Sequence, residues 1–190
     1  MKTFKTIIAF LIIASSTISC SSDDDKSFKI ENPLEAYHAK AGFTTVTNFI
    51  NAGDYEFGLV FTPTVKGNMK AITLKLPAVN PIVRVTVWDY ETKVVLRTES
   101  FNVAIADVQV AKEISDLPLE KNKKYLITMN SNDWYKKSKA DNTNAVYPIV
   151  AGNITVNEYR WIGTTSQVFP TNVSLNYNGG DLSFDFQQTE

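Results

Sequence analysis

Aromatic side chains next to charged ones are the residues of this sequence best suited to chemistry. One group is Asp-Trp-Tyr-Lys at 133–136, and a second is Tyr-Arg-Trp at 159–161. Flat rings can cover the C–H-rich faces of a sugar while neighbouring polar groups hold its hydroxyls. The candidate ligand-binding residues are therefore Asp133, Trp134, Tyr135, Lys136, Tyr159, Arg160 and Trp161.

The same rings could instead belong to a protein core. Alternation along a strand places Tyr159 and Trp161 on one face, and the interior of a β-sandwich would accept that face. The sequence favours a buried Trp161 and assigns Trp88 to the core. It leaves Trp134, in the polar stretch 130–145, open to either interpretation.

Oxygen-bearing side chains cluster around the first aromatic group. Asn130, Asn132, Asp133 and Asp141 bring carbonyl or carboxylate oxygens into the stretch 130–145, which we expect to be a long loop. Calcium binds such hard oxygen ligands, whereas zinc prefers imidazole and thiolate groups. A calcium site and ordinary solvated turns both remain open, with turns favoured because these residue types stabilise them.

Catalytic groups are scarce. The chain has one histidine, His38, and one cysteine, and it contains no G-x-S-x-G nucleophile motif. A glycosidase would need two acids that converge beside the aromatic residues. We therefore predict that the protein is not an enzyme. The nearest acid pairs in the sequence are Asp89 with Glu91 and Asp181 with Asp185.

Length and charge narrow the function classes further. The chain has 190 residues, of which 44% are hydrophobic, so it can form one domain with its own core. Lys and Arg number 19 against 20 Asp and Glu. Nucleic-acid-binding domains usually carry a large basic excess, so we do not expect a nucleic-acid partner.

The N-terminus is typical of an export signal. Lys2 and Lys5 precede the apolar run 6–14, which is too short to span a bilayer as a helix. Small or β-branched residues then lead to the only cysteine, Cys20. The arrangement resembles the lipobox of bacterial lipoproteins, which implies cleavage after residue 19 and acylation of Cys20. An ordinary secretory signal is the alternative.

The polar, acidic run that follows the cysteine indicates a solvated tether over 20–26. An acidic stretch at this place is similar to the surface-export signal of lipoproteins from the Bacteroidota. That resemblance implies a protein anchored by lipid in the outer membrane and facing the cell exterior.

The rest of the chain, 27–190, predicts a single all-β domain. Short runs with period two, such as Val83, Val85 and Val87, alternate with turn residues, which is typical of an antiparallel β-sandwich of jelly-roll or immunoglobulin-like type. We treat 27–56 as an N-terminal extension packed on the sandwich, in which 34–40 could form a helical turn or an edge strand.

The stretch 57–135 resembles β-sandwich domains of unknown function in bacterial surface and carbohydrate-active proteins. The resemblance lies in Phe61–Pro63, Gly67–Leu74, Val85–Asp89 and the strand 119–127 with its Tyr125. It implies a sandwich more than any activity.

Together these features favour a non-catalytic surface lipoprotein that binds a glycan or a cell-envelope polymer through its aromatic residues. The alternative is a structural or accessory protein that docks on a protein partner at the outer membrane.

Overall fold

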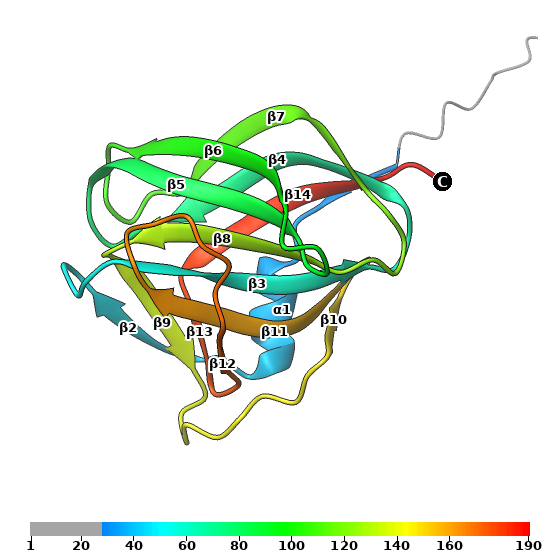
Figure 1. Cartoon of the computed structure of the whole chain (residues 1–190). Helices are drawn as coiled ribbons and strands as arrows, with labels where there is room; N and C mark the ends of the chain where they lie inside the picture. Colours follow the sequence, from blue (N-terminus) through cyan, green and yellow to red (C-terminus); the bar gives the residue numbers. More distant parts are fainter. Residues whose placement is uncertain (1–27) are drawn as a thin grey trace, which may run out of the picture.

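The computed structural model describes residues 28–190, in which one short helix and fourteen strands form two facing sheets and a small third sheet (Figure 1). Every strand pairing is antiparallel. The prediction of an all-β sandwich is therefore confirmed. The predicted signal peptide, Cys20 and the tether 20–26 lie outside the described residues.

The four-stranded sheet forms one layer of the sandwich. Its strand order is β1-β14-β4-β7. The strands are β1 (Ile30–Glu31), β4 (Gly67–Lys75), β7 (Val110–Leu119) and β14 (Asp181–Gln188).

The seven-stranded sheet forms the other layer. Its order is β10-β11-β3-β8-β5-β6, and β12 pairs with β11 outside this path. The strands are β3 (Tyr55–Pro63), β5 (Asn80–Asp89), β6 (Val95–Val103), β8 (Tyr125–Ser131), β10 (Ile149–Ala151), β11 (Ile154–Gly163) and β12 (Asn172–Ser174).

The core lies between these two sheets, and strand alternation builds it. Phe57, Leu59 and Phe61 of β3 are buried in one cluster with Phe184 of β14. The rings of Phe61 and Phe184 lie 4.5 Å apart between centroids. Tyr125, which starts β8, is also buried, and its hydroxyl accepts a hydrogen bond from the backbone N–H of Glu120 at 2.9 Å. The predicted alternating strands therefore supply the inward faces of both sheets.

The outer face of the seven-stranded sheet is also covered. There Trp88 packs in a second cluster with Val60 and Leu126. The segment 164–171, which we call the strap, crosses this face between β11 and β12 and places Phe169 against Trp88 (Figure 1). Trp88 is 4% exposed, which confirms its assignment to the core.

The described part of the expected N-terminal extension, residues 28–56, packs on the sandwich and adds elements of its own. It contains β1, the helix α1 (Leu34–Ala41) and β2 (Thr45–Phe49). The helix ends at Gly42, whose φ of 73° is left-handed and favours glycine. Tyr37 of α1 is fully buried in the main core, so this region completes the fold.

The stretch 130–145 differs from the expected long loop. β8 continues to Ser131, and residues 134–138 form the strand β9 (Trp134–Ser138). β9 lies at the centre of the three-stranded sheet β13-β9-β2, where β13 spans Tyr177–Gly179. Two consecutive lysines hide this strand from an analysis based on alternating apolar residues, although it has backbone partners on both sides.

Candidate functional site

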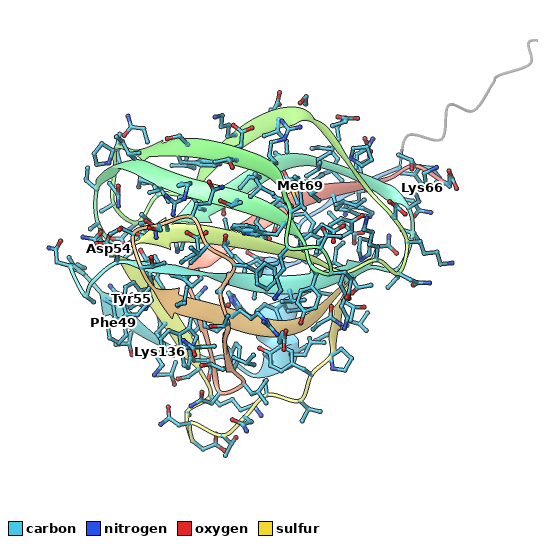
Figure 2. The ribbon with its side chains drawn as sticks, in the orientation of Figure 1. Phe49, Asp54, Tyr55, Lys66, Met69 and Lys136 are labelled. Atoms are coloured by element: carbon cyan, nitrogen blue, oxygen red, sulfur yellow. The ribbon has the colours of Figure 1, made fainter. Side chains whose placement is uncertain are left out.

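An aromatic pocket of about 210 Å³ lies between the three-stranded and seven-stranded sheets. Five strands contribute to it, and all but one of its eight lining residues are aromatic. Figure 2 shows Phe49, Tyr55 and Lys136 close together at one end of the molecule. The lining residues are Phe49, Tyr55, Phe57, Trp134, Lys136, Tyr159, Trp161 and Tyr177.

Backbone pairing fixes the positions of the rings. Phe49 of β2 lies opposite Trp134 of β9, and Phe57 of β3 lies opposite Trp161 of β11. Aromatic residues at such facing positions contact each other and stabilise the pairing of their strands. The pocket walls are therefore built on sheet backbone and not on loops.

The rings around Trp134 form a continuous wall. The Phe49 and Trp134 rings stack with centroids 5.3 Å apart and an angle of 10° between their planes. Tyr55 meets Trp134 edge-on at 5.1 Å and Trp161 at 5.9 Å. These distances lie within the range of favourable aromatic pairs.

The opposite wall contains Tyr159 and Tyr177, whose ring centroids are 5.3 Å apart. Burial raises the pKa of Tyr159 well above its ordinary value, with Tyr177 and Tyr147 adding to the effect. Tyr159 is therefore a neutral phenol at any physiological pH.

Polar groups are few but are attached to the same walls. The indole N–H of Trp161 donates to the hydroxyl of Ser174 at 3.0 Å. The indole N–H groups of Trp88 and Trp161 both have partners, whereas that of Trp134 has none within residues 28–190. The pocket thus combines apolar ring faces with a small set of hydrogen-bonding groups, a lining typical of small-molecule sites.

The structure brings four of the seven predicted ligand-binding residues into this pocket. Trp134, Lys136, Tyr159 and Trp161 line it, and Tyr159 and Trp161 share one face as expected. Trp161 is partly buried, packs against the main core and also lines the pocket.

The other three predicted residues lie elsewhere. Tyr135 alternates with Trp134 and is buried on the opposite face of β9, where its hydroxyl donates to Asp107. Asp133 is buried and accepts the backbone N–H of Asn51 at 2.8 Å. Arg160 contacts Glu158 at 2.6 Å and the Tyr90 hydroxyl at 2.9 Å. Strand alternation separates Tyr135 and Arg160 from the pocket, and Asp133 lies in the turn between β8 and β9.

The residues considered for calcium do not form one ligand set. Asn130 and Asn132 flank the end of β8 with Asp133, whereas Asp141 follows the far end of β9 and accepts two hydrogen bonds from Thr143. No three His, Cys, Asp or Glu side chains gather in a metal-binding group anywhere in residues 28–190.

Asn130 has a different role, because its side-chain amide ties two walls of the pocket together. It donates to the backbone oxygen of Tyr55 at 3.2 Å and to that of Thr164 at 2.9 Å. The N–H of Thr164 in turn donates to the backbone oxygen of Asp54 at 2.9 Å. These bonds fix the start of β3 beside the end of β11, where Trp161 lies.

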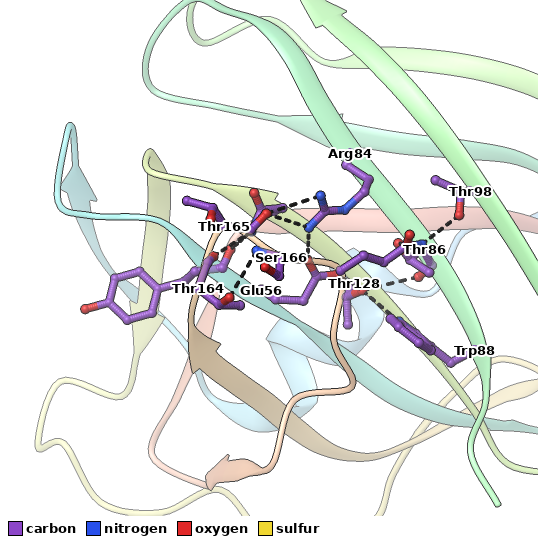
Figure 3. A network of polar contacts seen from close by, with 12 residues as sticks. Glu56, Arg84, Thr86, Trp88, Thr98, Thr128, Thr164, Thr165 and Ser166 are labelled. Atoms are coloured by element: carbon purple, nitrogen blue, oxygen red, sulfur yellow. Dashed lines mark hydrogen bonds and ion pairs between the residues drawn. The ribbon is translucent and has the colours of Figure 1, made fainter. Parts of the chain in front are cut away.

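A polar network supports the same region from the outer face (Figure 3). Glu56 is fully buried and forms an ion pair with Arg84 at 2.8 Å. It also accepts a hydrogen bond from the hydroxyl of Thr128. Burial raises the pKa of Glu56, while Thr128 and Arg84 oppose that rise. Arg84 also donates to the backbone oxygen of Thr165 in the strap. The network therefore anchors β3 between Tyr55 and Phe57, whose rings enter the pocket from the other face.

Four pocket residues were not predicted from the sequence. Phe49 and Tyr55 stand in the undecided N-terminal region, Phe57 was assigned to a core strand, and Tyr177 follows the strap. The available signal was the position of aromatic residues at strand ends, but the strand partners that bring these ends together are not visible in one sequence.

A separate polar cavity of about 390 Å³ contains the only histidine. His38 is 8% exposed, and burial and the nearby Lys137 lower its pKa to about 4. Asp181 lies 2.7 Å from Lys137 and 3.5 Å from Lys75. Asp185, its predicted acid partner, also lines this cavity and accepts a hydrogen bond from Asn32. The histidine and these acids thus lie apart from the aromatic lining.

The other acid pair lies in a turn. Asp89 accepts the backbone N–H groups of Glu91 and Thr92 at 3.1 and 2.9 Å. The Thr92 bond and Lys123 lower the pKa of Asp89 to about 2. The geometry is that of a turn-stabilising carboxylate.

Comparison with models of protein families and with curated proteins finds no match to this chain. Within residues 28–190, no helix has the length and hydrophobicity needed to cross a membrane.

Proposed function

We propose that this protein is a non-catalytic saccharide-binding module and that the aromatic pocket is its site. The observation that carries the proposal is the convergence of Trp134, Trp161, Tyr55 and Tyr177 on one partly exposed pocket. A ring such as Trp134 offers a broad apolar face, and its free indole N–H can bond a sugar hydroxyl.

The size of the pocket favours a single sugar ring. Its volume of about 210 Å³ lies below the roughly 300–1,000 Å³ typical of sites for drug-sized ligands. A longer glycan would therefore insert one residue and extend the remainder over the surface.

The pocket lies far from the point at which the described chain begins. Ile30 pairs with Gln187 of β14, and the next residue of β14 pairs with Gly67, which starts β4 shortly after β3 ends. Tyr55 is the first residue of β3 and lines the pocket. At about 3.3 Å per residue, the length of β3 places the pocket roughly 26 Å from the end of the molecule at which Ile30 lies. Figure 2 shows Lys66 and Tyr55 at opposite ends of the molecule. A protein tethered by its N-terminus would thus present the pocket away from the membrane.

A glycan array and a matched pair of variants test this function. We expect specific binding of at least one saccharide by residues 27–190. Loss of a central aromatic contact costs about 2 kcal/mol or more, so Trp134→Ala should weaken binding roughly thirtyfold.

Phe169→Ala is the control because Phe169 is a half-buried aromatic on the outer face of the sheet. Both variants should lose similar stability, and only Trp134→Ala should lose binding. Equal binding by the two variants would contradict the proposed site.

A second candidate function is docking on a protein partner. The loop after β4, the start of β5 and the loop after β6 expose aliphatic side chains, and the two loops are joined by the hydrogen bond from Asp107 N–H to the Leu76 carbonyl at 2.9 Å. β4 begins at Gly67, near the start of the described chain, and this apolar surface lies beyond the other end of β4. A protein is therefore a better occupant of the surface than a membrane that holds the N-terminus. The exposed residues are Val79, Ile82, Ile105 and Val108.

Cross-linking on intact cells distinguishes this second candidate. A partner should be captured by the wild-type protein and lost with Ile82→Asp, while saccharide binding should be unchanged. Capture that is insensitive to Ile82→Asp would remove the support for this docking surface.

A further inference from the structure

Lys136 is the only charged residue that lines the aromatic pocket. Its ammonium group lies 4.7 Å from the centre of the Tyr177 ring. Trp134 and Lys136 are two positions apart in β9, so both side chains point to the same face of the strand. The charge is therefore fixed at the site itself and not at its periphery.

No carboxylate neutralises this charge within the described chain. The neighbouring Lys137 pairs with Asp181 at 2.7 Å, whereas Lys136 forms no ion pair among residues 28–190. The pocket lining also contains no Asp or Glu. A partly buried cation without a counter-charge creates a positive potential in a pocket that aromatic walls shield from water.

This potential selects between two ligand classes that aromatic pockets accept. Aromatic cages bind quaternary ammonium groups through the faces of their rings. Here the ammonium of Lys136 already occupies the face of Tyr177 and would repel a second cation. An anion, in contrast, gains a charge-assisted hydrogen bond from Lys136.

We propose that the saccharide residue that enters the pocket carries a negative charge, a carboxylate or a sulfate, that Lys136 binds. The sugar ring stacks on the wall formed by Trp134 and Tyr55, and its anionic group lies toward Tyr177. This inference rests on the proposed saccharide-binding function and narrows it to acidic glycans.

Pairs of oligosaccharides that differ only in charge test the inference. Oligogalacturonate and hyaluronan fragments are compared with their methyl esters, and a sulfated oligosaccharide is compared with its desulfated form. Titration calorimetry should show binding of charged forms and a loss of about ten- to a hundredfold in the neutral ones, the range expected for a hydrogen bond to a charged group. The two kinds of pair distinguish a carboxylate from a sulfate.

Variants that each remove one charge locate the effect. Lys136→Gln should abolish the difference between charged and neutral forms, and Lys136→Arg should retain it. Lys121→Gln removes the same charge from an exposed turn remote from the pocket and should leave the preference intact.

The outcomes separate this inference from the function on which it rests. Equal binding of charged and neutral sugars overturns the acidic preference and leaves saccharide binding standing. Binding of choline in place of sugars, or of no saccharide at all, overturns both. An acidic preference that survives in Lys136→Gln overturns the role of this residue.

Discussion

Protonation of His38 is the perturbation whose energetic effect the structure defines best. The ring is 8% exposed, with Nε2 3.0 Å from the Asn178 side-chain nitrogen and Nδ1 3.4 Å from the Lys137 ammonium. Burial, followed by Lys137, lowers the pKa from 6.5 to about 4, although Asp181 opposes this effect. The folded protein therefore holds a neutral imidazole at neutral pH.

The sign and size of the effect follow from this lowered pKa. Below about pH 6.5 the unfolded chain binds a proton that the folded chain refuses until about pH 4. The free energy of unfolding should thus fall as the pH decreases through this interval. At 1.36 kcal/mol per pKa unit, the loss reaches about 3 kcal/mol.

Urea unfolding of the wild-type protein and His38→Gln at several pH values measures this loss. Carboxylates titrate in part of the same range, so the difference between the two proteins is the relevant quantity. It should change by about 3 kcal/mol between about pH 7 and pH 4. Parallel stability curves would refute the reasoning. If His38→Gln does not fold, NMR titration of the single histidine gives the pKa directly, and a value near 6.5 would also refute it.

Two further predictions concern the sheet that supports the pocket. Gly58→Ala should prevent stable folding, because the added Cβ would lie 1.8 Å from the backbone oxygen of Ile127. The control is Gly163→Ala, whose Cβ would meet only an ordinary contact at 3.5 Å. In thermal melts followed by circular dichroism, this control should melt like the wild type. Arg84→Ala should cost about 3–5 kcal/mol in urea unfolding, because it leaves buried Glu56 without its ion-pair partner. The double variant with Arg84→Ala and Glu56→Gln should recover part of the lost free energy of unfolding. If the double variant is less stable than Arg84→Ala alone, the unpaired charge of Glu56 is not the cause of the loss.

Much of the sandwich could be predicted because its strands follow simple alternation. Val83, Val85 and Val87 are fully buried, as their pattern indicates. β9 was missed because its backbone is satisfied by β2 and β13, two strands distant in sequence. The sequence does not decide between a helical turn and an edge strand in the region 34–40, because the buried Tyr37 contacts a core assembled from the rest of the chain.

The candidate site was predicted in part for the same reason. Residue type alone identified Trp134, Lys136, Tyr159 and Trp161, and the structure places them together. Residue type could not separate Tyr135 from Trp134, because only the strand conformation of β9 sends adjacent side chains to opposite faces.

The indole N–H signals in a two-dimensional NMR spectrum test the central claim most directly. The chain has three tryptophans, of which Trp134 and Trp161 line the pocket and Trp88 is buried on the outer face, where it serves as an internal control. Addition of the saccharide that binds best on the array should shift the signals of Trp134 and Trp161 and leave that of Trp88 in place. Unchanged pocket signals at saturating saccharide, or an equal shift of all three, would contradict a saccharide site in the aromatic pocket.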